Sequence, residues 1–288
     1  MATMRDIKRK IGSIVKTQQI TRAMKMVAAA KLRRVQESTL HLRFYSTKVE
    51  ELMTGLLKES SLLFHPLFRY GDVKNIELII ITADRGLCGA FNHNVLKRAE
   101  NMIKGFDKEG KSVSLNVIGR HGYNYLKFRG YGFRKTYMDI LAKEAKFTDA
   151  MRIMDDVMNV FLEEKVDEVY LIYTRFINTL IQRVTVKQVL PLSVEEVKGK
   201  AVAQYIFEPS MKEVLEALLP HYVYILLYSA MLESLASEQA ARMTAMDNAT
   251  KNADEMIRML TLSFNKARQI AITKELIEIT TSIEAMRY

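Results

Sequence analysis

Residues Met243–Ala271 read MTAMDNATKNADEMIRMLTLSFNKARQIA, and this stretch decides the fold. From Met243 onward, the first and fourth positions of each seven-residue period are apolar or small over about four periods. A repeat of 3.5 residues predicts a left-handed coiled coil, because it keeps one seam of a helix facing its partner. The seam positions are Met243, Met246, Thr250, Ala253, Ile257, Leu260, Phe264, Ala267 and Ala271.

The helix that carries this seam is expected to be long. No Gly or Pro occurs from His221 to Tyr288, a run of 68 residues, whereas an ordinary helix averages about 11–12 residues. At about 1.5 Å per residue, such a helix reaches on the order of 100 Å. A compact domain of this size cannot enclose it, so the helix must protrude or pair with another.

The N-terminal segment is the expected partner. It has 42 residues without Gly or Pro, from Ser13 to Thr54, and three alanines at 28–30 that allow close helix approach. We therefore predict that residues 1–58 and 210–286 form a long antiparallel two-helix coiled coil, which indicates a mechanical or assembly part. An ordinary helical bundle is the alternative, and the helix lengths and the lack of other helices disfavour it. The apolar positions expected in the N-terminal seam are Ile7, Ile11, Ile14, Ile20, Met24, Val27, Leu32 and Val35.

The net charge of +10 is concentrated at the N-terminus. Residues 1–48 contain twelve Lys or Arg and two acidic residues, and the remaining 240 residues sum to zero. Such a segment is expected to face an anionic neighbour: nucleic acid, lipid headgroups or an acidic protein surface. A nucleic-acid arm is the weaker reading, because no aromatic residue precedes Phe44 and no helix-turn-helix is evident.

Residues 75–195 predict a small central α/β domain of Rossmann-like type. Short apolar runs at 76–83, 113–118 and 168–174 are typical of buried strands, and 183–189 alternates like an edge strand. Helices are expected at 91–104 and 148–164. Because strands and helices alternate, the sheet should be largely parallel.

Few residues point to chemistry of the chain's own. The loop Gly86-x-x-Gly89 lies between a strand and a helix but matches no phosphate-binding motif, so a tight turn is favoured over a nucleotide site. Cys88 is the only cysteine, which excludes a disulfide framework, and the five histidines lack metal-site spacing. We expect no catalytic residue, cofactor or metal. Neither a secretory signal nor a transmembrane run is evident.

Four segments together resemble the gamma subunit family of F-type ATP synthase, in its bacterial form. They are TQQITRAMKMVAAAKL at 17–32, DRGLCGAFN at 84–92, ASEQAARMTAM at 236–246 and NKARQIAITKEL at 265–276. The likeness covers essentially the whole chain in order and is weakest in the middle domain.

This resemblance implies a central rotor shaft without a catalytic site of its own. The coil would turn inside a ring of alpha and beta subunits, and the chain would rest on the c-ring beside the epsilon subunit. Proton flow would then drive the beta sites through ATP synthesis or hydrolysis. The implied location is the cytoplasmic face of the bacterial plasma membrane, with membrane contact only through the c-ring.

The resemblance also implies residues for each contact. Those facing beta would be Met24, Lys25, Cys88, Arg242, Gln269 and Thr273. Those near the c-ring would be Tyr205 and Glu208. The chain departs from similar sequences at its tip, Thr280–Tyr288, which lacks a small Gly/Ala ending, and it lacks the cysteine-pair insertion of the chloroplast form. A basic coiled coil that binds nucleic acid and a small nucleotide-binding enzyme are the alternative functions.

Overall fold

The computed structural model describes residues 4–59, 65–69, 71–142, 144–192, 208 and 210–286. The chain forms two compact units: unit 1 comprises Met1–Ala28 with Met243–Tyr288, and unit 2 comprises Ala29–Arg242. The long helices α1 (Met4–Glu59) and α5 (Met211–Ala285) each contribute residues to both units.

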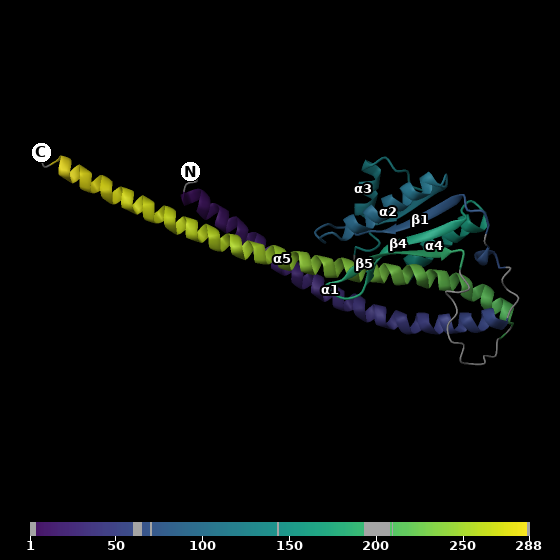
Figure 1. Ribbon diagram of the computed structural model, residues 1–288. Helices are drawn as coiled ribbons and strands as arrows, with labels where there is room; N and C mark the ends of the chain where they lie inside the picture. The colour runs from purple at the N-terminus through teal and green to yellow at the C-terminus, as the bar shows by residue number, and fades with distance from the viewer. Residues whose placement is uncertain are drawn as a thin grey trace. The chain divides into compact units, whose positions relative to one another are not determined.

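In unit 1, α1 and α5 pair side by side in antiparallel fashion (Figure 1). Three side-chain pairs show the direction: Gln18 with Asp254, Thr21 with Thr250 and Lys25 with Asp247. Residue numbers rise along α1 while those of the partners on α5 decrease, so the two helices are antiparallel. The expected seam of α5 is confirmed, because Met246 and Ala253 are buried and the other seam positions are half-buried among exposed neighbours.

The seam of α1 differs from the prediction. Ile20 and Val27 are exposed, at 60% and 57%. The buried or half-buried positions of α1 in unit 1 are Ile7, Ile11, Ile14, Val15, Gln18, Thr21, Met24, Lys25 and Ala28. The predicted positions Ile7, Ile11, Ile14 and Met24 are therefore confirmed, and the prediction is wrong at Ile20 and Val27. The apolar pattern also missed three polar positions of this set, Gln18, Thr21 and Lys25.

Unit 2 contains a five-stranded sheet in the order β3-β2-β1-β4-β5. Strands β1 (Asn75–Ile81), β2 (Ser112–Ile118), β3 (Lys135–Tyr137) and β4 (Glu168–Phe176) run parallel, and the edge strand β5 (Gln182–Leu190) is antiparallel to β4. The predicted largely parallel sheet is confirmed, while β3 and the helix α3 (Arg120–Phe128) are additions.

Both faces of this sheet are covered by helices, as expected for strands that are apolar on both sides. The side chains of Ile76, Leu78 and Ile80 pack in a cluster with residues of α2 (Phe91–Lys108) and α3. The alternate residues Ile79 and Ile81 belong to the main core, together with α4 (Phe147–Leu162), α5 and the unit 2 part of α1. A 3₁₀ turn at Pro66–Phe68 closes that core.

Among the described residues, one helical region (Lys212–Ile283) contains a window long and apolar enough to cross a membrane by length and composition. Half of that window is buried within the protein. The sequence predicted no transmembrane run, because polar residues interrupt this window and it is not a continuous apolar stretch.

Candidate protein-interaction site

A buried ion pair on α5 lies against the glycine loop of unit 2. The Arg242 guanidinium contacts the Glu238 carboxylate at 2.6 Å, one turn earlier on the helix, and both side chains are about nine-tenths buried. Arg242 also donates hydrogen bonds of 3.2 Å to the backbone carbonyls of Arg85 and Gly86. Burial raises the pKa of Glu238, and the charge of Arg242 opposes this rise. The pair therefore fixes the loop on α5.

The glycine loop is a packed turn. Leu87 and Gly89 adopt positive φ angles of 62° and 58°, which lets the chain reverse before α2. Cys88 is buried, and Asn92 donates to its Sγ at 3.3 Å. Burial raises the pKa of the Cys88 thiol. Two carbonyl oxygens of this loop accept from Arg242, whereas a phosphate-binding loop presents N–H groups to its ligand.

In unit 1, polar side chains meet within the seam. The Lys25 ammonium contacts the Asp247 carboxylate at 2.5 Å, and Lys251 reaches the other carboxylate oxygen at 2.9 Å. Both hydrogen bonds lower the pKa of Asp247, and the one from Lys25 has the larger effect. One turn away, the hydroxyls of Thr21 and Thr250 lie 2.8 Å apart. We call these two contacts, Lys25 with Asp247 and Thr21 with Thr250, the polar layer. Met24, the neighbour of Lys25 in the chain, is half-buried.

The distal part of α5 is exposed. Gln18 lies opposite Asp254. In the same register Met4, fourteen residues before Gln18, lies opposite position 268, fourteen residues after Asp254. Gln269 and Thr273 lie beyond that point and are exposed. Large apolar side chains are also exposed here, including Ile272 and Ile283 at 49% and 56%.

The sequence-predicted site residues thus fall in separate places. The structure brings Cys88 and Arg242 together in unit 2, and it places Met24, Lys25, Gln269 and Thr273 in unit 1. Glu208 is exposed, and Tyr205 lies outside the described residues. Sequence reasoning missed the partners Glu238, Asp247 and Asp254. A signal was available for Glu238 alone, since it stands among small residues in ASEQAA at 236–241, and a buried acidic residue requires a partner.

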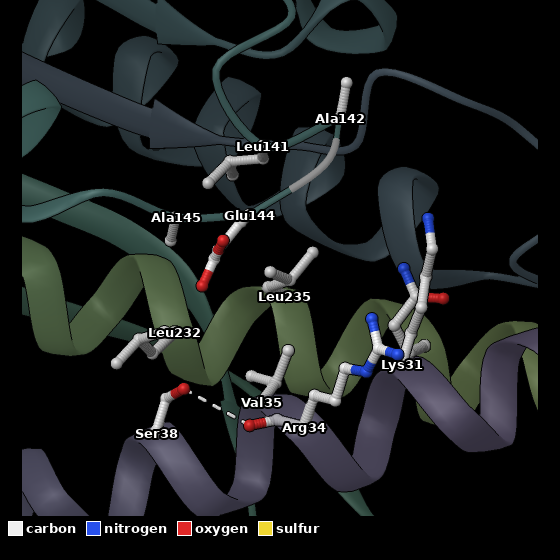
Figure 2. Close-up of a pocket in the computed structure, with 11 residues that line it drawn as sticks. Lys31, Arg34, Val35, Ser38, Leu141, Ala142, Glu144, Ala145, Leu232 and Leu235 are labelled. Carbon is white, nitrogen blue, oxygen red and sulfur yellow. Dashed lines mark hydrogen bonds between the residues drawn. The ribbon is translucent and has the colours of Figure 1, made fainter.

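Unit 2 also contains a cavity of about 170 Å³. Figure 2 shows Glu144 reaching into it from the loop before α4, opposite Arg34 and Lys31 of α1. Its walls are largely apolar, and Ser38 donates its hydroxyl proton to the Arg34 carbonyl at 3.2 Å. The lining residues are Lys31, Arg34, Val35, Ser38, Leu141, Ala142, Glu144, Ala145, Leu232, Leu235 and Gln239.

Metal-ligating side chains do not converge in the described parts of the chain: no group of three His, Cys, Asp or Glu could hold an ion there. What the described residues of unit 1 do present is a charged helix pair and an exposed end of α5 with large apolar side chains.

Comparison with known proteins agrees with this description. The family model described as ATP synthase matches residues 3–286. The ATP synthase gamma chain of Pelotomaculum thermopropionicum is 43% identical over 99% of this chain and 100% of its own length. That of Aquifex aeolicus is 44% identical over 98% of this chain and 97% of its own.

Solved structures give the same picture. A chain in the central stalk and c-ring structure of Tetrahymena thermophila mitochondrial ATP synthase has a TM-score of 0.61 at 27% identity, over 80% of this chain and 99% of that one. A chain of Euglena gracilis mitochondrial ATP synthase has a TM-score of 0.68 over 98% of this chain and 94% of that one; its 21% identity supports the fold alone.

Proposed function

Because this chain belongs to the gamma-chain family of ATP synthase, we propose that it is the central rotor shaft of an F-type ATP synthase. The observation that carries this proposal is the full-length match to gamma chains. In this role the shaft couples rotation of a proton-driven c-ring to the conformational cycle of catalytic beta subunits. Residues 1–58 and 210–286 would supply the shaft, and residues 75–195 would supply the α/β domain.

The paired helices of unit 1 suit a part that transmits torque. A seam of half-buried residues runs along α5 from Met243 to Ala271, and the polar layer at Thr21 and Lys25 holds α1 in one register. Two helices joined in this way resist bending and twisting better than either helix alone. Beyond position 268, α5 would enter the ring as a single helix, and its exposed apolar side chains suit an apolar sleeve.

The charge of α1 suits an acidic partner. Arg9, Lys16 and Arg22 are exposed, and the 1–48 segment holds the net charge of the whole chain. An acidic lever segment of beta would be attracted to this band without a deep apolar contact, so it could release the shaft as it turns.

Individual contacts follow from the same role. Met24, Lys25 and Cys88 would lie near the acidic lever of beta, while Arg242, Gln269 and Thr273 would lie near beta loops higher in the ring. Because Cys88 and Arg242 are buried, we expect them to shape the surface of the glycine loop rather than touch beta with their own polar atoms. Tyr205 and Glu208 would contact the c-ring.

We further propose that the chain carries no catalytic site, and that ATP chemistry occurs on beta. The glycine loop supports this, since its spacing matches no phosphate-binding motif and two of its carbonyls accept from Arg242. The partners would be alpha, beta, epsilon and the c-ring, without nucleic acid. The complex would sit at the cytoplasmic face of a bacterial plasma membrane, with this chain reaching the membrane only through the c-ring.

A rotation assay tests the proposal. The chain carries a Cys88→Ser change and a new attachment thiol, Lys108→Cys, at the exposed end of α2. It is assembled with alpha and beta, the ring is fixed to a surface, and a gold rod is attached to the thiol. We expect ATP-dependent rotation in one direction. Failure to assemble with alpha and beta, or ATPase activity with a stationary rod, would contradict a rotor role.

A further inference from the structure

The cavity beside Glu144, of about 170 Å³, lies between α1, α5 and the segment 141–145 that precedes α4. Protein interiors are packed as densely as organic crystals and contain few voids larger than a water molecule. In another protein, an engineered apolar cavity of about 150 Å³ binds benzene. The cavity beside Glu144 is therefore large enough to hold a ligand the size of one aromatic ring.

Buried apolar side chains form most of its walls. Val35 of α1 and Leu232 and Leu235 of α5 line the cavity and are buried, and so are Leu141 and Ala145 from the segment before α4 (Figure 2). An apolar ligand would make dispersion contacts with side chains of all three segments, and it would remove apolar surface from water. The walls therefore favour a ligand with a compact apolar body.

Three charged side chains stand at the same cavity. Figure 2 shows Lys31 and Arg34 of α1 on one side and Glu144 reaching in from the other. Within the ranges that the structure describes, no salt bridge includes any of these three residues, whereas the neighbouring Arg33 pairs with Glu37. Two cations and one carboxylate give the cavity a local charge of +1, so one further negative charge would neutralise it.

Arg34 is the cation best suited to hold a ligand anion. Lys31 is half-buried, and its charge also acts on the buried carboxylate of Glu238. Arg34 is exposed. Its planar guanidinium can bind a carboxylate through two parallel hydrogen bonds, which a lysine ammonium cannot do.

The charges of the cavity select among ligands of the same size. A cationic ligand would meet two like charges and one opposite charge. An uncharged apolar ligand would gain nothing from Arg34, and a dianion would bring a second negative charge towards Glu144. A single carboxylate on a compact apolar body matches both the charges and the walls.

We propose that the cavity beside Glu144 binds a small organic monoanion with a compact apolar body, of which an aromatic monocarboxylate is the simplest case. The carboxylate lies on Arg34, and the body lies among Val35, Leu232 and Leu235. Because such a ligand contacts two helices and the segment 141–145 of the folded chain, its binding raises the stability of unit 2. The proposal concerns the chain by itself and does not depend on the rotor function.

Titration of the full-length chain with 4-fluorobenzoate tests this. Fluorine NMR of the probe measures binding, and thermal unfolding measures stabilisation. The comparison probes 4-fluorobenzyl alcohol and 4-fluorobenzylamine carry the same ring with a neutral or a cationic group. We expect saturable binding of one equivalent of 4-fluorobenzoate, at least about tenfold tighter than binding of the amine, and a midpoint of unfolding that rises with its concentration. Absence of saturable binding, or equal affinity for the amine, would overturn the proposal.

A matched pair of variants locates the carboxylate. Arg34→Gln should weaken binding of 4-fluorobenzoate at least about tenfold, because it removes a charge-assisted pair of hydrogen bonds. Arg33→Gln removes the same charge from the next residue, which is exposed and does not line the cavity, so it should leave the affinity unchanged. Equal affinities of these two variants would refute the site, since the probe would then respond only to the overall positive charge.

Two further variants test the remaining parts of the cavity. Glu144→Gln should tighten binding of 4-fluorobenzoate about threefold or more, because it removes the carboxylate that competes for the same cations; weaker binding would contradict the proposed charge balance. Val35→Phe places a larger side chain in the space and should abolish binding, and retained binding in the folded variant would show that the probe lies elsewhere. Arg34 and Glu144 are exposed, so their variants decide the question even where Val35→Phe does not fold.

Discussion

Replacing Arg242 by Met should destabilise the chain strongly at neutral pH and much less in acid. The substitution leaves Glu238, only 6% exposed, without its ion-pair partner. Removing one member of a buried pair costs about 3–5 kcal/mol. Two further hydrogen bonds, to the carbonyls of Arg85 and Gly86, are lost with the guanidinium. Each hydrogen bond to a charged group contributes about 1.5–3 kcal/mol. The two costs overlap, because the measured cost of breaking a buried ion pair already includes part of the lost hydrogen bonding.

The pH dependence follows from the direction of the pKa shift. Burial raises the pKa of Glu238 in the folded chain, and removal of Arg242 raises it further. A carboxyl with a raised folded pKa favours folding when it is protonated, below its unfolded pKa, and this contribution is lost as the pH rises through the folded pKa. The deficit of Arg242→Met should therefore be largest above that folded pKa and shrink on acidification.

Urea unfolding of the full-length chain at pH 8 and pH 5 measures both effects. We expect the double variant Arg242→Met/Glu238→Gln to recover about 2 kcal/mol or more at pH 8, because it removes the uncompensated charge. Only the loss of the loop hydrogen bonds should remain, and it should not vary with pH. An equal deficit at both pH values, with no recovery in the double variant, would refute the assignment of the cost to a buried charge.

Three further outcomes are expected. Ile257→Pro interrupts the seam of α5 in unit 1 and costs about 3 kcal/mol; proton pumping driven by ATP should be lost in membranes that carry this variant, and full pumping would contradict a load-bearing coil. Thr21→Val with Thr250→Val replaces both hydroxyls of a seam pair, so the free energy of unfolding should change by less than about 1 kcal/mol; a loss above about 2 kcal/mol would show that the pair stabilises the coil directly. Burial and the raised pKa of the Cys88 thiol should make its alkylation by iodoacetamide at pH 7.5 at least about tenfold slower in the native chain than in urea, and equal rates would show that the thiol is accessible.

The C-terminal seam could be predicted because its positions are apolar or small for nine consecutive seam sites. The same reasoning on α1 was wrong at two of its eight positions, Ile20 and Val27, which are apolar but exposed. Three positions of α1 that face α5, Gln18, Thr21 and Lys25, are polar. They could be assigned to the seam only once their hydrogen-bond partners on α5 were known. A pattern of hydrophobicity within one segment cannot reveal a polar residue that is satisfied by a segment more than 200 residues away.

The sheet was predicted for a similar reason: β1, β2 and β4 are short apolar runs buried on both faces. The strand β3 has three residues, too few for any periodicity. The helix α3 contains Gly122, which lowers helix propensity. Glycine is needed at this position because of a contact with another segment: a Cβ there would lie 2.7 Å from the Thr82 hydroxyl oxygen. The cavity beside Glu144 was also beyond the sequence, since it joins residues from separate segments.

The polar layer in the unit 1 seam explains how a long two-helix shaft keeps its alignment. A seam of apolar residues alone gains nearly the same burial after a slip of one heptad, because one apolar contact replaces another. The layer does not allow such a slip: displaced by seven residues, Lys25 would leave Asp247, and the Thr21 hydroxyl would lose that of Thr250. Polar contacts stabilise the coil less than apolar packing would, but they make one register lower in free energy than its neighbours. For a rotor this matters more than stability, because its asymmetric surface can time the catalytic subunits only if each side chain stays at a fixed height along the axis.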